Sequence, residues 1–331
     1  MTAEQPTIDI IIVNWNTRQQ LQECLSSLSC TRRNGYVVGR VVVVDNGSTD
    51  HSADNLSFSN LPLRVIRNDN NRGFSAACNQ GVSGSEADYF LFLNPDARLL
   101  DDTLEKSVEC MSMPEHSHIG ILGVQLLCDN GEVARSCARF PTTWSFVSKM
   151  TGLNRLFPRT FPDHFYLEWD HLQSCPIEQV MGAYFFVRKS VFDATNGFDE
   201  RFFVYFEEVD LCLRALQAGW STYYLATAQC YHSGGGSSGQ ITAVRLFYSL
   251  RSRILYGFKN FKMDSAVALF LSTLLIEPIS RVCQAILSGS AARVKGVLHA
   301  YLLLWRALPE ILGNSHLRKS GSLNLDLETP R

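Results

Sequence analysis

The sequence lacks the motifs of several common protein classes. Its ten cysteines include no CxxC pair and no regular spacing, which argues against a zinc site or a disulfide framework and favours the reduced thiols of a cytoplasmic protein. No GxGxxG follows the first apolar run, and no GxxxxGK followed by Ser or Thr occurs. A dinucleotide oxidoreductase or a P-loop NTPase would therefore lack its usual phosphate loop. The first residues, MTAEQPT, do not predict a cleaved secretion signal, because no apolar run follows a basic region.

Charge is sparse and unevenly distributed. Of the 331 residues, 19% are charged and 46% are hydrophobic, a composition that excludes a disordered chain. Residues 1–244 hold 18 Lys and Arg against 27 Asp and Glu, whereas residues 245–319 hold 11 against 3. The acidic body makes nucleic-acid binding unexpected. The basic and apolar C-terminal part suits an anionic membrane surface.

Short apolar runs alternate with segments of helical spacing in the first hundred residues. The runs are rich in Val and Ile, as are strands of a parallel sheet that is covered on both faces. This alternation predicts an α/β, doubly wound fold. We expect strands at 8–14, 40–45, 63–68, 88–94, 118–127 and 182–190, helices at 17–28, 73–84, 101–112 and 207–219, and loop with short helix at 136–180.

The C-terminal part contains three apolar stretches. Residues 241–262 place five basic residues among Leu, Phe and Tyr at helical spacing. The run at 266–276 has only eleven residues before a Glu-Pro pair, which is short for a membrane span, and the run at 296–312 is interrupted by a His and an Arg. Both runs fit helices that lie in a membrane interface or on a partner, and they equally fit core helices. We expect residues 320–331 to be a disordered tail.

Two polar turns follow predicted strands. Asp45 ends an apolar strand and is followed by Asn46, so its carboxylate can accept hydrogen bonds from a base or ribose; an Asx turn with a helix cap is the alternative. Asn71, Arg72 and Gly73 lie at a strand-to-helix turn, where backbone amides and a guanidinium can meet a pyrophosphate.

The segment LFLNPDARLL ends an apolar strand at a proline. Pro95 cannot donate to a sheet ladder, so the chain must leave the sheet and present Asp96 at its carboxyl edge. Ligands of open α/β sheets bind at that edge, and carboxylate oxygens bind hard divalent cations. One Asp is a poor metal site by itself, so further ligands must come from substrate phosphates, water or another part of the chain.

Acidic residues gather at one predicted helix start. Glu207, Glu208 and Asp210 fall within four residues, where the helix dipole favours carboxylates and should keep them ionised. An ionised carboxylate can act as a general base, although a charged helix start is a common surface feature. Further along, His232 precedes a run of Gly and Ser that suggests a lid ordering on substrate binding.

Taken in order, these segments resemble the family 2 inverting glycosyltransferases with a GT-A fold, and most closely the bacterial rhamnosyltransferase type. The segments that carry the resemblance are VVDNGSTD (43–50), NRGFSAACNQG (71–81), LNPD (93–96), GFDERFFVYFEEVDLCLRALQAGW (197–220) and His232 with GGGS (234–237). The resemblance implies a GT-A domain at 1–240, with a nucleotide-binding half at 1–100 and an acceptor and catalytic half at 101–240. A helical region at 241–319 follows it.

The resemblance also implies ligands and roles. It implies a nucleotide-sugar donor and a Mg²⁺ or Mn²⁺ ion, held by Asp96 and His232. Glu208 occupies the Asp position of the family's Glu-Asp base motif, with Glu207 and Asp210 as alternative bases. Asn94 stands where many relatives carry a first Asp, which weakens direct metal binding. The donor-binding residues are expected to be Asn14, Asn16, Asp45, Asn46, Asn71, Arg72, Gly73, Asn79, Asn94 and Asp96.

The function expected from the resemblance is transfer of L-rhamnose from dTDP-rhamnose to a saccharide acceptor, or to a lipid-linked one, in cell-surface polysaccharide synthesis. The enzyme would be cytoplasmic or peripheral on the cytoplasmic membrane face. Three alternatives remain open at this stage: the same chemistry with a UDP-hexose donor, a nucleotide-sugar pyrophosphorylase, and an inactive carbohydrate-binding relative. A pyrophosphorylase would want a Gly-rich basic loop after the first strand, where this chain has NWNTRQQ.

Overall fold

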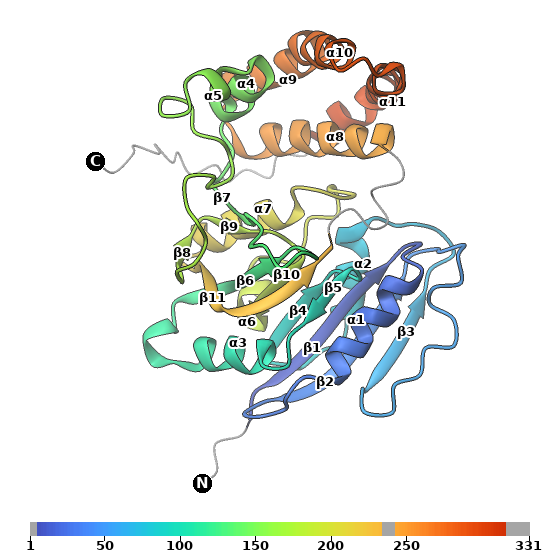
Figure 1. The fold of residues 1–331 in the computed structure, drawn as a ribbon, viewed down its shortest axis with the longest axis vertical. Helices are drawn as coiled ribbons and strands as arrows, with labels where there is room; N and C mark the ends of the chain where they lie inside the picture. Colours follow the sequence, from blue (N-terminus) through green and yellow to red (C-terminus); the bar gives the residue numbers. More distant parts are fainter. Residues whose placement is uncertain (1–4, 234–241, 316–331) are drawn as a thin grey trace.

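A mixed nine-stranded sheet forms the centre of the molecule in the computed structural model, which describes residues 5–233 and 242–315 (Figure 1). The strand order is β3-β2-β1-β4-β10-β6-β11-β5, and β8 pairs with β11. The strands are β1 (Thr7–Asn14), β2 (Val37–Asp45), β3 (Leu63–Arg67), β4 (Tyr89–Leu93), β5 (Ala97–Leu99), β6 (Ile119–Leu127), β8 (Cys175–Ile177), β10 (Tyr184–Arg188) and β11 (Ser221–His232). A separate pair joins β7 (Cys137–Ala138) to β9 (Gln179–Val180).

The first four sheet strands confirm the predicted doubly wound half. β3, β2, β1 and β4 are all parallel, as crossover connections through helices require. Along β1, Ile8, Ile10 and Ile12 pack with α1 (Gln19–Ser29), whereas Ile11 and Val13 pack on the opposite face with α2 (Phe74–Val82). Successive side chains of a strand point to opposite faces, so one apolar run serves two helix layers.

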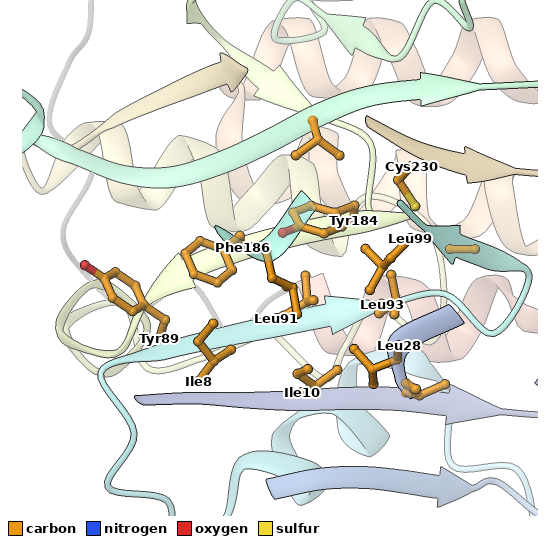
Figure 2. Close-up of a cluster of buried hydrophobic side chains, with 14 of the residues drawn as sticks. Ile8, Ile10, Leu28, Tyr89, Leu91, Leu93, Leu99, Tyr184, Phe186 and Cys230 are labelled. Atoms are coloured by element: carbon orange, nitrogen blue, oxygen red, sulfur yellow. The ribbon is translucent and has the colours of Figure 1, made fainter. Parts of the chain in front are cut away.

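The second half turns the sheet antiparallel at its centre. β10 runs antiparallel to both β4 and β6, and the aromatic rings of Tyr89 and Phe186 stack across the β4–β10 pair at 5.0 Å. Figure 2 shows Leu91 and Leu93 of β4 beside Tyr184 and Phe186 of β10 in the buried core. The remaining helices of this half are α3 (Thr103–Ser112), η1 (Pro114–His116), α6 (Lys189–Ala194) and α7 (Glu207–Gln217).

One local prediction needs correction. Residues 136–180 were expected to be loop and short helix, but they also contain β7, β8 and β9 besides α4 (Thr143–Thr151) and α5 (Leu153–Leu156). These strands have two or three residues each, too few for a visible alternation. The strand before His232 is twelve residues long and includes that histidine as its last residue. The GGGS lid segment and the tail from 320 lie outside the described residues.

Helices α8 (Thr242–Asn260), α9 (Met263–Leu271), η2 (Ser272–Ile276), α10 (Glu277–Leu287) and α11 (Ala291–Ser315) form a bundle beyond α7 (Figure 1). The stretch from α9 to α10 is one helical rod, longer than the apolar run predicted it to be. Pro278 does not end it, because the wide π turn of η2 precedes it and Pro278 lies in the first turn of α10. By length and apolar composition, the described helix at 263–287 could cross a membrane.

The basic residues of α8 do not form the solvent-facing surface that their number predicted. Arg251 and Arg253 are buried, and Lys259 is paired inside the protein with Asp199. Arg253 pairs with Glu277 of α10, which joins the two helices. Most of these basic side chains therefore pair with carboxylates or donate to backbone carbonyls within the protein.

Candidate functional site

The carboxyl edge of the parallel strands gathers the first polar residues of the site. Asn14 and Asp45 are register partners at the ends of β1 and β2. Asn14 is fully buried, and its Nδ2 lies 2.9 Å from Asp45 Oδ1 and 2.9 Å from Ser52 Oγ. The amide of Asn14 orients the half-buried Asp45, whose carboxylate is left at the sheet edge, and donor contact by Asn14 stays a prediction.

Asn46 ties the two polar turns together. Its Oδ1 accepts from the backbone N–H of Arg72 at 3.1 Å, and its Nδ2 donates to Asn71 Oδ1 at 2.9 Å. Asn71 Oδ1 also accepts from the N–H of Gly73, and the N–H of Phe74 donates to the Phe203 carbonyl. The N–H groups of Arg72, Gly73 and Phe74 therefore have partners within the protein, and contact of this turn with a pyrophosphate stays a prediction.

Gly73 is required for a close approach rather than for a phosphate. Its φ is +88°, and a Cβ there would lie 2.7 Å from the Phe203 carbonyl oxygen. Arg72 is exposed beside it, so donor contact through the guanidinium stays a prediction. The strand-to-helix turn is thus packed directly on the loop that leads to the acidic helix.

Two other asparagines also serve the loops. Asn16 Oδ1 accepts from the N–H of Thr49 at 2.8 Å, which fixes the turn after Asp45. Asn79 spans α2 and the segment before α7, with Oδ1 accepting from the N–H of Phe198 at 3.0 Å and Nδ2 donating to the Phe198 carbonyl at 2.9 Å. Donor contact by Asn16 and Asn79 stays a prediction, and the structure supplies each with a scaffold role.

Asp96 and His232 come together from segments 136 residues apart. β5 pairs antiparallel with the end of β11 and sets His232 opposite Ala97. This places His232 Nε2 3.4 Å from Asp96 Oδ1, with both side chains only slightly exposed. Asn94 lies at the same edge, where its N–H donates to the Ala183 carbonyl at 3.0 Å. Across the parts of the chain that the structure describes, no group of three or more His, Cys, Asp or Glu is arranged to hold a metal ion.

Glu207 and Glu208 begin α7 after an unusual backbone. Tyr205 and Phe206 both have positive φ, 68° and 71°, which is rare for bulky residues and stores strain. Consecutive strained residues are common at functional sites, where neighbouring contacts must hold them. Here they turn the chain so that the first two helix residues point inward.

Burial dominates the acidity of this pair. Burial and the nearby Glu208 carboxylate raise the pKa of Glu207 well above its usual value, and burial raises the pKa of Glu208. Oε2 of each lacks a hydrogen-bond partner within the described residues. Desolvation therefore outweighs the helix N-terminus in this pair, and a carboxylate here is a stronger base than an exposed one.

Asp210 is used by the scaffold. It is fully buried, Arg214 Nε lies 2.7 Å from its Oδ2, and Lys259 Nζ lies 2.6 Å from its Oδ1. With a cation on each oxygen, Asp210 is unsuited to take a proton from an acceptor. Among the three acids, Glu208 is the half-buried one, and hence the most accessible to a substrate.

Helix α8 clamps the loop that carries the strain. Arg251 donates to the Arg201 carbonyl at 2.9 Å, and Ser252 donates to the Val204 carbonyl at 2.7 Å. Lys259 also lies 2.6 Å from Asp199, and with Arg201 it holds the pKa of that carboxyl below its usual range. α8 thus fixes the approach of Glu207 and Glu208 from the C-terminal bundle.

Gly182 connects the acidic helix to the sheet edge. A Cβ at Gly182 would lie 3.9 Å from Glu208 Cβ, and the next residue, Ala183, accepts the N–H of Asn94. Glu208 and the Asn94–Asp96 turn are thus separated by one short backbone segment. This side of the sheet therefore carries the carboxylate of Asp45 at the end of β2 and the Asp96–His232 pair after β4. The carboxylate of Glu208 lies next to Gly182, one backbone segment away.

Sequence reasoning missed three supporting residues. Lys259 was counted with a basic surface, although an Asp199 sixty residues away is its partner. Gly182 belonged to no motif, and Phe203 had no assigned role within the segment 197–220; only the tertiary fold brings them together with the site. The sequence signal that could have indicated a buried ion pair was the position of Lys259 among apolar residues at helical spacing.

Comparison with known proteins places this geometry in a family. The family model for glycosyl transferase family 2 matches residues 9–166, and that for glycosyl transferase family group 2 matches residues 89–319. The N-acetylglucosaminyl-diphospho-decaprenol L-rhamnosyltransferase of Mycobacterium tuberculosis is 25% identical over 261 residues, covering 75% of this chain and 83% of that protein. Rhamnosyltransferase WbbL of Escherichia coli is 27% identical over 179 residues, covering 52% of this chain and 62% of that protein.

The fold has solved counterparts. The mannosyltransferase PcManGT of Pyrobaculum calidifontis, solved with GDP-Man and Mn²⁺, superposes with a TM-score of 0.53 at 15% identity, covering 95% of this chain and 87% of that one. This likeness confirms the predicted GT-A type fold with a C-terminal helical extension. The chain therefore belongs to the family 2 glycosyltransferases, with a relationship to the bacterial rhamnosyltransferases.

Proposed function

We propose that the chain transfers L-rhamnose, with inversion, from dTDP-rhamnose to a lipid-linked saccharide in cell-surface polysaccharide synthesis. Two relatives named as rhamnosyltransferases support the sugar, and the decaprenol-linked acceptor in one of those names supports the acceptor class. The observation that carries the proposal is the convergence of Asp45, Asp96 with His232, and Glu208 on one sheet edge. We place the enzyme on the cytoplasmic face of the membrane, where nucleotide sugars are available.

The donor half is assigned to the edge of β1, β2 and β4. Asp45 accepts hydrogen bonds from the base or ribose, oriented by Asn14. Asp96 and His232 suit a divalent cation that also binds donor diphosphate oxygens; a carboxylate suits Mg²⁺ and Mn²⁺, and the imidazole favours Mn²⁺. When bound, this cation neutralises the charge that develops on the leaving nucleoside diphosphate.

The acceptor half is assigned to the start of α7. Glu208 takes the proton from the acceptor hydroxyl while that oxygen attacks the anomeric carbon from the face opposite the nucleotide. Its raised pKa brings the base closer to the pKa range in which general bases work at neutral pH. Glu207, buried behind it, is protonated in the working state and keeps a second negative charge away from the base.

The test is release of nucleoside diphosphate from candidate donors with Mn²⁺, Mg²⁺ or a chelator, together with transfer to a saccharide diphospholipid. We expect dTDP-rhamnose to be turned over with a divalent cation. Turnover of a UDP-hexose alone would keep the enzyme class and overturn the sugar. No release from any donor would favour the inactive carbohydrate-binding alternative. The nucleotide-sugar pyrophosphorylase alternative is excluded because the chain belongs to the family 2 glycosyltransferases.

A further inference from the structure

The rod from α9 to α10 has two apolar faces, of which only one is covered. Its inner face packs on the protein through buried residues that include Leu269, Thr273 and Ala285. Its outer face repeats at four-residue spacing and is exposed. We call this outer face the docking stripe; it consists of Met263, Val267, Leu271, Leu275, Ile279, Cys283, Ile286 and Leu287.

The docking stripe is unusually apolar for a surface. Leu275 is 58% exposed, Ile279 66% and Leu287 87%. Between 265 and 292 the charged residues are the buried Glu277 and Arg281, which pairs with it, whereas surface helices normally carry many charges. Trp144, 69% exposed, starts α4 beside this rod, where Thr143 Oγ1 lies 3.4 Å from the Ser265 carbonyl. Exposed apolar patches of this kind mark interaction surfaces.

Charge at the ends of the docking stripe identifies the occupant. Lys262 and Asp264 are exposed at its start, and Arg293 and Lys295 are exposed just after it, so the charge around the stripe is net positive. A second copy seated on this face would bring two surfaces of net positive charge together. An anionic lipid surface attracts the same cations while the headgroup region accepts the apolar side chains. We propose that the docking stripe lies in the interface of an anionic membrane.

The inner face of the rod shows why it lies on the membrane instead of crossing it. Glu277 is buried and paired with Arg253 of α8 and with Arg281. The Arg253–Glu277 pair belongs to the protein interior, and a crossing rod would have to break it or carry both charges into lipid. The inner face of the rod is therefore packed in the helical bundle, and the docking stripe on its outer face contacts the lipid headgroups.

This docking fixes the site relative to the membrane. α9 packs on α8, and α8 clamps the loop before Glu207 and Glu208, with the sheet on the far side of α7 (Figure 1). The consequence for substrate, that the lipid end of the acceptor stays in the membrane while its saccharide reaches Glu208, rests on the proposed function. Docking itself rests only on the exposed face and its flanking charges.

Flotation of the full chain with vesicles tests the proposal. We expect it to float with vesicles containing phosphatidylglycerol, less with pure phosphatidylcholine, and less again at high salt. The double variant Leu275→Asp with Ile279→Asp should lower the bound fraction by roughly tenfold or more. Val37→Asp, at an exposed apolar residue of β2 at the opposite end of the molecule, is the matched control and should float as the unmodified chain does.

A fluorescent label gives a second readout that does not require Asp substitutions in the docking stripe. Cys283 lies in the docking stripe, and Cys30 is exposed at the end of α1. In chains where Cys128, Cys175 and the other exposed cysteine are serine, an environment-sensitive dye on Cys283 should shift to the blue with anionic vesicles. The same dye on Cys30 should not shift.

The outcomes separate the competing readings. Failure to float, flotation unaffected by the double variant, or a dimer that the double variant dissociates would each overturn the proposal. Retention in the membrane after alkaline carbonate extraction would show a span, and would overturn it as well. Transfer to a water-soluble acceptor should be unchanged in the double variant. If the chain floats with the vesicles but turns over no donor, the proposed function is refuted and the membrane-docking proposal is not.

Discussion

Glu207 and Glu208 are adjacent and chemically alike, yet the structure predicts opposite results when the buried Glu207 and the half-buried Glu208 are each replaced by Gln. Glu208→Gln removes the base that faces Gly182 and the sheet edge. Glu207→Gln replaces a side chain whose raised pKa favours the protonated form with a neutral side chain of the same shape. The two variants therefore form a matched pair.

The size of each effect follows from the role. A positioned general base contributes about 10²- to 10⁴-fold, so Glu208→Gln should raise the barrier by about 3–5 kcal/mol. Donor affinity should be nearly intact, because Glu208 faces the acceptor side. Glu207→Gln keeps the neutral form of a buried group, so activity near neutral pH should stay within about threefold of the parent.

The acid limb of the pH profile carries the same information. A base works when deprotonated, so activity falls as pH drops through its pKa in the folded protein. Burial raises the pKa of Glu208, so the limb should lie above the ordinary Glu value of about 4.3. Glu207→Gln should keep a raised limb, since burial and not Glu207 is the main cause of the shift.

The assay is initial-rate nucleoside diphosphate release and transfer between pH 4 and pH 9, with donor affinity measured by calorimetry. Unchanged turnover in Glu208→Gln would refute the assignment. Loss in Glu207→Gln with retention in Glu208→Gln would exchange the two roles.

Three further predictions concern the supports of the site. Asp96→Ala should abolish the response of activity to added Mn²⁺, whereas Asn94→Ala should cost much less; equal losses in a metal titration would contradict the shared role with His232. Lys259→Met leaves the fully buried Asp210 with one cation fewer, so the free energy of unfolding should fall by about 3–5 kcal/mol and turnover should fall as well. Thermal unfolding measures the stability, and the exposed Lys262→Met is the control; equal stability in the two variants would contradict the role of α8 as a clamp. Gly182→Ala introduces a methyl group 3.9 Å from Glu208, so KM for the acceptor should rise with donor KM unchanged, and an unchanged acceptor KM would remove Gly182 from the acceptor path.

Prediction from the sequence was most accurate where a local pattern is compatible with a single structure. The Val- and Ile-rich runs predicted the parallel strands to within a few residues, because most of their side chains are apolar and buried on both faces. The polar exceptions, Asp9 of β1 and Arg40 of β2, pair with each other. Pro95 correctly predicted the exit from β4, since a proline cannot continue the ladder. The proximity of Asp96 and His232 then followed from pairing of β5 with β11, although β5, three residues long, was invisible in the sequence.

Prediction was weakest where the same residue type serves two environments. For Asn14, Asn46 and Asn79 the sequence suggested donor contact, which stays a prediction, and gave no sign of the hydrogen bonds by which their amides also hold neighbouring residues. The basic residues of α8 suggested an outer surface, but Arg253 and Lys259 neutralise buried acids. Only tertiary packing decides whether a polar side chain faces a ligand or another loop, and that information is not local.

The most direct test of the proposed chemistry is the anomeric configuration of the first product, followed by NMR during turnover of dTDP-rhamnose. A single attack assisted by Glu208 predicts a product whose configuration is opposite to that of the donor. A first product that retains the donor's configuration would contradict the account, because retention requires a different attack from the one that a single base supports.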